Sequence, residues 1–389
     1  FNDVYATLDN GAPDADVAST IEVSGRVAMS EDSFDSADLK LSIKDIAIDE
    51  KNRSILPPHI QPLCEKFSPD SRFDLDFEDF RIDLLSDGRK SIDFTGVLKF
   101  KGCDFNASDT QIRLDALLKI EGLYTTGEGF DDYNVAFDGG TVRVLGKAFD
   151  NVKADIVYDP ALNSWCTEGL VADCYNGKAT GKVELRQLSE SVSEYLVIIY
   201  FDNVDIQRFL SDTEAQKIPE GGFTTGKMNG SLSLSARSGD SSSRVGTCKL
   251  AITDMQVGRI SPLGRLLQVL QFTESHDYTF DQMFLDSYIR RDNLLVEKLD
   301  LSGRSVAFYG SGRMNLETKD VNLSLIARGR RAATDDPSIL QSLTEGLGRA
   351  VIRMEVTGDF YDPKVTTKTL PVLKDTLEIL GTKPASYNQ

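Results

Sequence analysis

The chain has 389 residues, of which 40% are hydrophobic and 27% are charged, and its formal net charge at pH 7 is −18. So acidic a surface repels phosphate backbones and anionic membrane surfaces, which argues against a nucleic-acid partner. No apolar run reaches the ~18–20 residues of a membrane span; the most apolar stretch, YLVIIYF at 195–201, is predicted to be a strand buried on both faces. The chain begins at Phe1 without a basic and apolar leader, so we expect a processed or trimmed piece, and any membrane anchor would lie upstream.

Alternation of apolar and polar residues dominates the chain and predicts β-strands joined in antiparallel hairpins. In chain order, the clearest runs contain Leu39, Leu41 and Ile43; Phe73, Leu75 and Phe77; Ile112, Leu114, Ala116, Leu118 and Ile120; and Val321, Leu323 and Leu325. The alternation changes phase at Glu78–Asp79, which predicts a β-bulge. Predicted turns lie at Asp87–Gly88, Gly127 with Gly129, Gly139–Gly140, Asn176–Gly177, Asn229–Gly230 and Ser302–Gly303.

A few short amphipathic helices are also predicted, at 56–67, 203–216, 261–272, 334–348 and 371–381. Helices this short depend on packing against the sheet. The sequence Pro-Glu-Gly-Gly at 219–222 interrupts the pattern. We therefore expect an N-terminal β-groove segment at 1–217, a C-terminal β module with short helices at 218–381, and a disordered tail at 382–389.

Five cysteines are an odd number, so at least one thiol is free or pairs outside the chain. Cys166 and Cys174 are eight residues apart, a spacing that suits a disulfide closing a short hairpin loop, and two free thiols are the alternative. Cys64, Cys103 and Cys248 are expected to be small buried hydrophobes. Because there is no CxxC pair and the chain has two histidines, neither a metal site nor a cofactor is expected.

The residue types of catalytic sites occur without the arrangement that catalysis needs. Ser275, His276 and Asp277 are adjacent, so their side chains cannot converge as a hydrolase triad, and we expect a polar loop. Carboxylates cluster at Asp74, Asp76, Glu78 and Asp79 and again at 131–132. Since Asp74 and Asp76 alternate with apolar residues, a solvated outer face is favoured over a glycosidase pair or a weak calcium site.

Three smaller features have structural interpretations. Trp165 is expected to be an anchor beneath a loop, and Gly310-Ser311-Gly312 is expected to be a hairpin turn. Arg328, Arg330 and Arg331 form a basic cluster, interpreted either as a solvated loop or as a contact for a lipid phosphate or an acidic partner.

The final third of the chain carries a recurring order of strand, glycine turn and strand around short apolar helices. The segments are GKMNGSLSLSA (226–236), CKLAITDMQV (248–257), SPLGRLLQVLQF (261–272), YIRRDNLLVEKLDLSG (288–303), VAFYGSGRMNLETKDVNLSLIARG (306–329) and RMEVTGDFYDPKV (353–365). This order resembles the C-terminal region of the AsmA-like family of envelope proteins, over roughly 221–380. The resemblance implies a mostly β fold, an elongated, coiled antiparallel sheet that forms a groove, related in design to bridge-like lipid transfer proteins.

The resemblance also implies a function without catalysis. The expected protein is a groove in the bacterial cell envelope that holds or conducts phospholipid acyl chains between inner and outer membranes. It would support outer-membrane biogenesis. The implied location is the periplasm, anchored in the inner membrane by a helix upstream of this chain, with envelope proteins as possible partners. The alternatives are a structural or adhesive β-sandwich array of the cell surface and, third, a carbohydrate-active enzyme.

Candidate groove residues follow from parity along the C-terminal strands. An alternating strand buries one face, and short helices are thin cover for a long sheet, so a coiled sheet would leave an apolar trough. The candidates share a parity within each strand: Leu232, Leu234, Leu250, Ile252, Val321, Leu323 and Leu325. They are expected either to form one lipid-contacting lining or to be ordinary core beneath the 261–272 helix.

Overall fold

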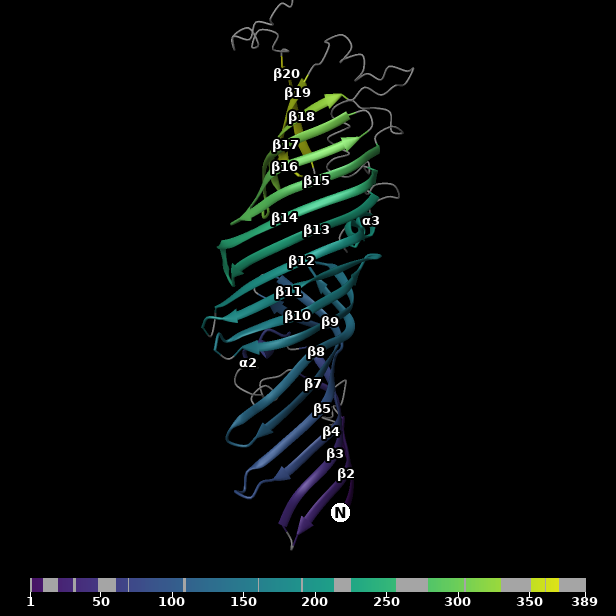
Figure 1. Ribbon diagram of the computed structural model, residues 1–389, viewed down its shortest axis with the longest axis vertical. Helices are drawn as coiled ribbons and strands as arrows, with labels where there is room; N and C mark the ends of the chain where they lie inside the picture. Colours follow the sequence, from purple (N-terminus) through teal and green to yellow (C-terminus); the bar gives the residue numbers. More distant parts are fainter. Residues whose placement is uncertain are drawn as a thin grey trace, which may run out of the picture. The chain divides into compact units, whose positions relative to one another are not determined.

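Strands make up most of the computed structural model, which describes residues 2–9, 20–30, 33–47, 61–68, 70–107, 110–159, 161–189, 192–212, 225–256, 279–303, 306–329, 351–360 and 362–370. Twenty strands in these ranges belong to one antiparallel sheet (Figure 1). The described pairings join strands that are consecutive in sequence, except that β5 (Lys90–Phe100) and β6 (Cys103–Ala107) both pair with β7 (Thr110–Thr125). This confirms the prediction of a mostly β fold built on a coiled antiparallel sheet. Cα packing divides the chain into two compact units.

The first unit comprises Phe1–Val204, Asp212–Ala215 and Leu232–Arg244. Its strands are β1 (Asn2–Asp9), β2 (Thr20–Ser30), β3 (Ser33–Ala47), β4 (Arg72–Leu84), β5 (Lys90–Phe100), β6 (Cys103–Ala107), β7 (Thr110–Thr125), β8 (Gly129–Val144), β9 (Lys147–Asp159), β10 (Ser164–Cys174), β11 (Gly177–Gln187) and β12 (Ser193–Asp205). Helix α2 (Gln61–Cys64) lies between β3 and β4 in sequence. Because β7 pairs with both β5 and β6, β6 continues the line of β5.

The second unit comprises Asp205–Ser211, Gln216–Ser231 and Val245–Gln389. It contains α3 (Ile206–Ser211), β15 (Thr279–Arg290), β16 (Asn293–Gly303), β17 (Val306–Asn315), β18 (Asp320–Gly329), β19 (Val351–Asp359) and β20 (Asp362–Leu370). Two strands, β13 (Thr225–Arg237) and β14 (Asp240–Gln256), are divided between the units. The predicted boundary at 217–221 lies outside the described residues.

The predicted helices are shorter in the structure, where they are described. Of the 56–67 prediction, residues 56–60 lie outside the described residues, and in the rest the α-helix is Gln61–Cys64. Of the 203–216 prediction, the helix is Ile206–Ser211, because β12 continues as strand to Asp205. The predictions at 261–272, 334–348 and 371–381 and the tail at 382–389 lie outside the described residues.

Three turn predictions are confirmed, at Asp87–Gly88, at Gly127 and at Asn176. Four others are wrong, because Gly139–Gly140, Asn229–Gly230, Ser302–Gly303 and Gly310-Ser311-Gly312 lie within β8, β13, β16 and β17. Gly140 shows the physical reason. A Cβ there would lie 2.3 Å from the Asp115 carbonyl oxygen on β7. The glycine permits close approach of neighbouring strands and does not reverse the chain.

The alternation predicted along individual strands is present. On β7, Leu114, Ala116 and Leu118 are buried while the residues between them are exposed. On β4, Phe77 pairs with Gly96 and Asp79 pairs with Thr95, so Glu78 is the extra residue of the predicted bulge. The strand at 195–201 is less buried than predicted, with half-buried residues on both faces and Tyr200 54% exposed.

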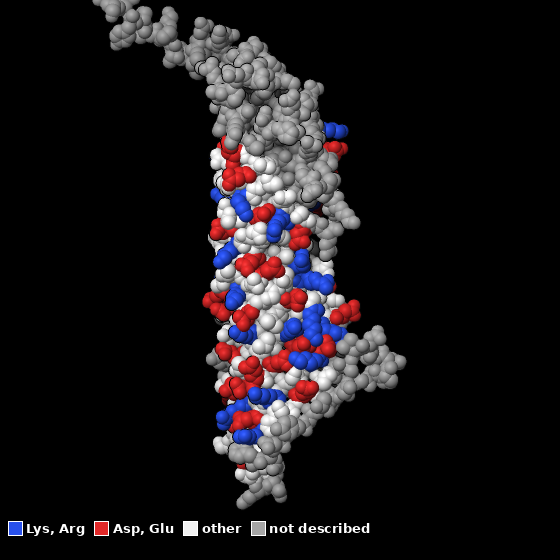
Figure 2. Space-filling view, turned by 90° about the vertical axis from the view of Figure 1, so that its right-hand side faces the viewer, with Lys and Arg blue, Asp and Glu red and all other residues white. Residues whose placement is uncertain are grey.

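Each unit buries apolar side chains on its inner face. In the first unit the core cluster consists of Phe100, Cys103, Leu114 and Leu118. In the second unit Phe280 and Phe308 are each 1% exposed, and their ring centroids are 6.0 Å apart. The opposite face carries the charges, and Figure 2 shows acidic and basic side chains interspersed over the surface in view. The inner and outer faces of the sheet therefore differ sharply in polarity.

Gly310 provides a test of this close strand packing. A Cβ at Gly310 would lie 2.3 Å from Leu325 Cδ2 and 2.6 Å from the Ser324 carbonyl oxygen. We expect Gly310→Ala to lower the free energy of unfolding by roughly 1–3 kcal/mol, as overpacking does, in urea denaturation followed by circular dichroism. Ser311→Ala, exposed on the other face of the same strand, should change it by less than about 0.5 kcal/mol. Equal effects would contradict this packing role.

Candidate functional site

The inner face of the second unit is a continuous apolar surface. Side chains alternate between faces along each strand, and the pairing register carries each row across the strands. One row consists of Leu250, Leu285, Leu299, Gly310, Leu325 and Met354. The parallel rows are Ile252, Met283, Leu301, Phe308 and Ala327; Cys248, Ser287, Val296, Gly312, Leu323, Val356 and Val365; and Gly246, Ile289, Leu294, Met314, Val321, Gly358 and Pro363. We call these four rows the lining.

The lining brings together five of the seven candidate residues from the sequence: Leu250, Ile252, Val321, Leu323 and Leu325. The other two, Leu232 and Leu234, lie on the part of β13 that belongs to the first unit. Both are half-buried, and they share a parity with the buried Ala236. The register within the second unit thus joins the candidates of β14 with those of β18.

Burial varies along the lining. Ile252 and Val321 are each 5% exposed and Leu325 is 2% exposed, whereas Leu250 and Leu323 are half-buried. Partly exposed leucines surrounded by buried apolar neighbours leave hydrocarbon in contact with water. An apolar ligand that covered them would gain the free energy of removing that surface from water.

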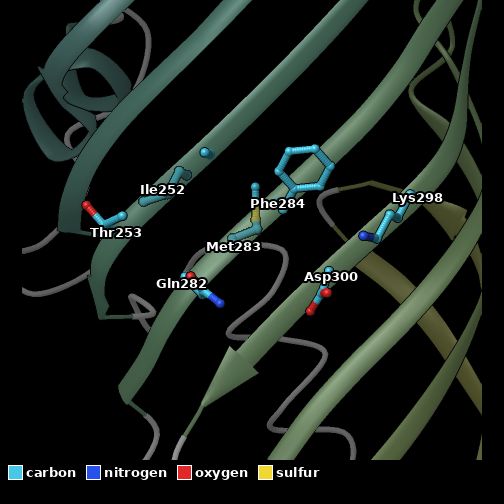
Figure 3. A pocket seen from close by; sticks show the side chains of 8 residues that line it. Ile252, Thr253, Gln282, Met283, Phe284, Lys298 and Asp300 are labelled. Carbon is cyan, nitrogen blue, oxygen red and sulfur yellow. The ribbon is translucent and has the colours of Figure 1, made fainter.

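The opposite face of the same strands carries a shallow depression (Figure 3). It has a volume of about 290 Å³ and is lined by Ala251, Ile252, Thr253, Gln282, Met283, Phe284, Lys298 and Asp300. Lys298 Nζ lies 5.2 Å from the centroid of the Phe284 ring, a cation–π distance. Because Phe284 alternates with Leu285 and Asp300 with Leu299, the depression lies on the polar face. Two lining residues, Ile252 and Met283, border it from within the sheet.

The first unit has a comparable inner face, with more aromatic residues. Its longest rows are Ile43, Leu75, Leu98, Leu118, Phe137 and Ala154; and Leu41, Phe77, Gly96, Ile120, Val135 and Ile156. Trp165 lies on β10 with its ring centroid 4.6 Å from that of Tyr158 and 6.5 Å from that of Tyr133. Burial raises the pKa of Tyr133 to about 12.

This aromatic cluster gives the described surroundings of Trp165. Its side chain extends from strand β10 and packs against the rings of Tyr158 and Tyr133. Trp165 and Tyr158 are direct partners in the β9–β10 pairing. In a hairpin, residues at equal distances from the turn face each other across the two strands. Tyr158 and Trp165 each lie one residue from the end of their strand at this hairpin, a spacing in the sequence that could have identified the pair.

The segment Gln61–Ser68, which we call the strap, packs on the inner face of the first unit. Phe67 stacks on Phe100 with ring centroids 5.3 Å apart and meets Phe105 edge-on at 5.0 Å. The Asn106 N–H donates to the Lys66 carbonyl at 2.7 Å and the Ser68 N–H donates to the Asp104 carbonyl at 2.8 Å. These contacts attach the strap to β6 and place Phe67 against the core cluster.

The carboxylate cluster on β4 is not simply a solvated outer face, so this prediction is wrong for Asp74. Asp74 is 7% exposed, and Lys101 Nζ lies 2.6 Å from its Oδ1. The backbone N–H of Asp45 donates to the same oxygen at 3.0 Å. Asp76 is paired with Lys44 at 2.6 Å. Lys101 follows β5 and reaches back to Asp74, a contact that alternation along β4 does not reveal.

The predicted Cys166–Cys174 disulfide is also wrong. Both residues lie on the single strand β10, where eight residues span roughly 25 Å, far beyond the ~4.4–6.8 Å between the Cα atoms of a disulfide. Both thiols are free, and burial raises the pKa of Cys174 to about 11. Cys103 is 1% exposed, as expected of a small buried hydrophobe, whereas Cys64 and Cys248 are half-buried.

Several other candidates lie wholly or partly beyond the described residues. They are Ser275, His276, Asp277, Arg330 and Arg331, and no side-chain placement is described for Arg328 or for 131–132. Within the described ranges, no group of three or more His, Cys, Asp or Glu side chains is arranged to hold a metal ion. No helix in those ranges is long and apolar enough to cross a membrane.

The buried Asp74 predicts a pH dependence of stability. Burial disfavours its charged form, but hydrogen bonds from Lys101 and the Asp45 N–H, with the attraction of both Lys101 and Lys44, outweigh burial and lower its pKa. A lowered folded-state pKa stabilises the fold above the unfolded value of about 3.9, and this contribution is lost as pH falls through the folded-state value.

We therefore expect Asp74→Asn to reduce the free energy of unfolding by about 1–3 kcal/mol at neutral pH, the range for a hydrogen bond to a charged group. The difference from the unsubstituted protein should shrink below about pH 4. Urea denaturation at a series of pH values measures this. Asp79→Asn, exposed on the same strand, is the matched control. A difference for Asp74→Asn that did not change with pH would contradict the assignment.

In comparisons with known proteins, no family model, no curated protein and no solved structure matches this chain. The resemblance to the AsmA-like family therefore stays a prediction, and function is argued from the geometry of the inner face.

Proposed function

We propose that this chain is a non-enzymatic lipid-binding protein whose lining holds the acyl chains of a phospholipid and transfers them along the sheet. The observation that carries the proposal is the lining itself, four apolar rows in register that begin on β14, two of which continue to β20, and that include half-buried leucines. Its chemistry, hydrocarbon without convergent polar groups, suits an acyl chain better than a polar substrate.

The dimensions of the lining support an acyl ligand. Seven strands at a spacing of about 4.8 Å span roughly 30 Å. One acyl chain occupies about half of a bilayer's ~30 Å hydrocarbon core, so the lining is long enough for it. Each CH₂ group removed from water contributes about 0.8 kcal/mol. Apolar contacts are non-directional, so a chain bound in this way can still slide.

The proposed setting follows from the resemblance to AsmA-like proteins. It is the periplasm of a bacterial envelope, with an inner-membrane anchor upstream of this chain and lipid passing between inner and outer membranes during outer-membrane biogenesis. The partners would be the two membranes and envelope proteins at either end.

A structural or adhesive β-protein of the cell surface is the second candidate. The core cluster of the first unit favours it, since Phe67 packs against buried residues there as in an ordinary protein interior. A carbohydrate-active enzyme is less well supported, because Asp74 and Asp76 are engaged by lysines.

Native mass spectrometry of the purified protein, with organic extraction of the same sample, separates the two leading candidates. The lipid-binding proposal expects phospholipid to co-purify in stoichiometric amounts and to be replaced by added phospholipid vesicles. Protein that stays lipid-free after incubation with vesicles would favour the adhesive alternative.

The lining can be tested at Leu323. Leu323→Asp places a carboxylate among the apolar rows, where burying an unpaired charge opposes binding by several kcal/mol when fully enclosed. Because Leu323 is half-buried, we expect lipid occupancy to fall at least about fivefold while the β-sheet circular dichroism persists.

Asn322→Asp is the matched control, since Asn322 is exposed on the opposite face of the same strand and the substitution adds the same charge. It should leave occupancy unchanged. Unfolding of Leu323→Asp, with no folded lipid-free state, would instead identify Leu323 as ordinary core.

A further inference from the structure

The strap brings a lysine to the start of β12, on the inner side of the first unit. Lys66 Nζ donates to Ser193 Oγ at 3.3 Å, across 127 positions of sequence. Ser193 is 3% exposed, and its hydroxyl donates to Gln187 Oε1 at 2.8 Å. Its backbone is fixed by the turn after β13, because its N–H donates to Ser238 Oγ at 2.9 Å and its carbonyl accepts the Ser238 N–H at 2.8 Å. The hydroxyl that faces the lysine is thus held in place.

The charge of Lys66 is not neutralised in the way that other lysines of this unit are. Lys44, Lys101 and Lys119 each have a carboxylate oxygen 2.6 Å away. Within the described ranges, no carboxylate pairs with the half-buried Lys66, and burial lowers the pKa of Lys66. An ammonium has three donors and Ser193 accepts one of them.

The chain neighbours of Lys66 and Ser193 belong to the apolar and aromatic inner face of the first unit. Phe67, the next residue, stacks on Phe100 within the core cluster. On the other side, Tyr195 shares the face of Ser193 and pairs with Leu185, which pairs in turn with Trp165. A cation that a fixed hydroxyl positions at the margin of an apolar surface matches an amphipathic ligand with an anionic end.

We propose that the Lys66 ammonium, positioned by Ser193 Oγ, binds a phosphate-type oxyanion through its two remaining N–H donors, namely the head group of an anionic phospholipid whose acyl chains lie on the apolar inner face. This inference deepens the proposed lipid-binding function and rests on it for the source of the phosphate. Binding would supply the missing counter-charge of Lys66 and strengthen its hydrogen bonds, because ion-to-ion hydrogen bonds are shorter and stronger than neutral ones.

The test compares lipids that differ only in the head group. The full chain is incubated with vesicles of phosphatidylglycerol or of phosphatidylcholine with identical acyl chains, re-isolated and analysed by native mass spectrometry. We expect the unsubstituted protein to take up the anionic lipid roughly five- to tenfold more, as suits one charge-assisted contact. Lys66→Met should abolish this preference without lowering phosphatidylcholine uptake, and Lys66→Arg should keep it.

Lys119→Met is the control for loss of one positive charge, since Lys119 is paired with Asp138 on the charged face. Circular dichroism and the phosphatidylcholine uptake of each variant show that its fold is retained. A preference for phosphatidylglycerol that survives Lys66→Met, or that Lys119→Met lowers equally, would overturn the proposal.

Titration with inorganic phosphate in a calorimeter separates the two sources of the oxyanion. Phosphate binding that Lys66→Met removes, in a protein that shows no head-group preference, would assign the site to free phosphate and overturn the head-group assignment. A protein that takes up neither lipid would defeat the proposed function, while the phosphate titration would still decide the oxyanion site. No binding of phosphate and no head-group preference would overturn the site altogether.

Discussion

Register between hydrogen-bonded strands is the constraint on which the rest of this structure depends. Since side chains alternate between faces, a slip of one residue would exchange the apolar and polar faces of a whole strand. The second unit keeps its register even where β16 carries an extra residue. Leu285 faces Leu299 and Ser287 faces Val296, so the extra residue is absorbed at the exposed Glu297 and Lys298. The bulge preserves the apolar rows, which is why one lining runs across seven strands.

The polar face requires paired charges and the inner face requires close apolar packing, and residues on adjacent strands supply both. On the polar face, charges are matched between adjacent strands, as Lys249 is with Asp286 at 3.2 Å. On the inner face, glycines such as Gly312 let a leucine from the next strand lie close to the backbone. The acidic excess of the chain therefore stays on one side of the sheet, and hydrocarbon can accumulate on the other.

The sequence predicts what depends on local alternation and misses what depends on distant contacts. The β7 strand, the bulge at Glu78 and the shared face of the lining candidates all follow from parity along single strands. A glycine in the sequence does not by itself predict a turn. Gly88 lies in a turn, whereas Gly310 lies inside a strand and allows the neighbouring strand to approach closely, and the sequence does not distinguish these two roles. Neither the contact of Lys101 with the buried Asp74 nor the hydrogen bond from Lys66 to Ser193 was predicted. Both join residues that are far apart in the sequence, so no local pattern indicates them.

The contact between the strap and β12 has a consequence for how the chain folds. Most strands pair with the preceding one through short connections, so hairpins can form early and add on one after another. Lys66 and Ser193 are 127 residues apart, and the loop between them closes only after the intervening strands have paired. The contact of Lys66 with Ser193 is therefore expected to form late in folding, whereas Phe67 can pack on Phe100 and Phe105 as soon as β5 and β6 are in place.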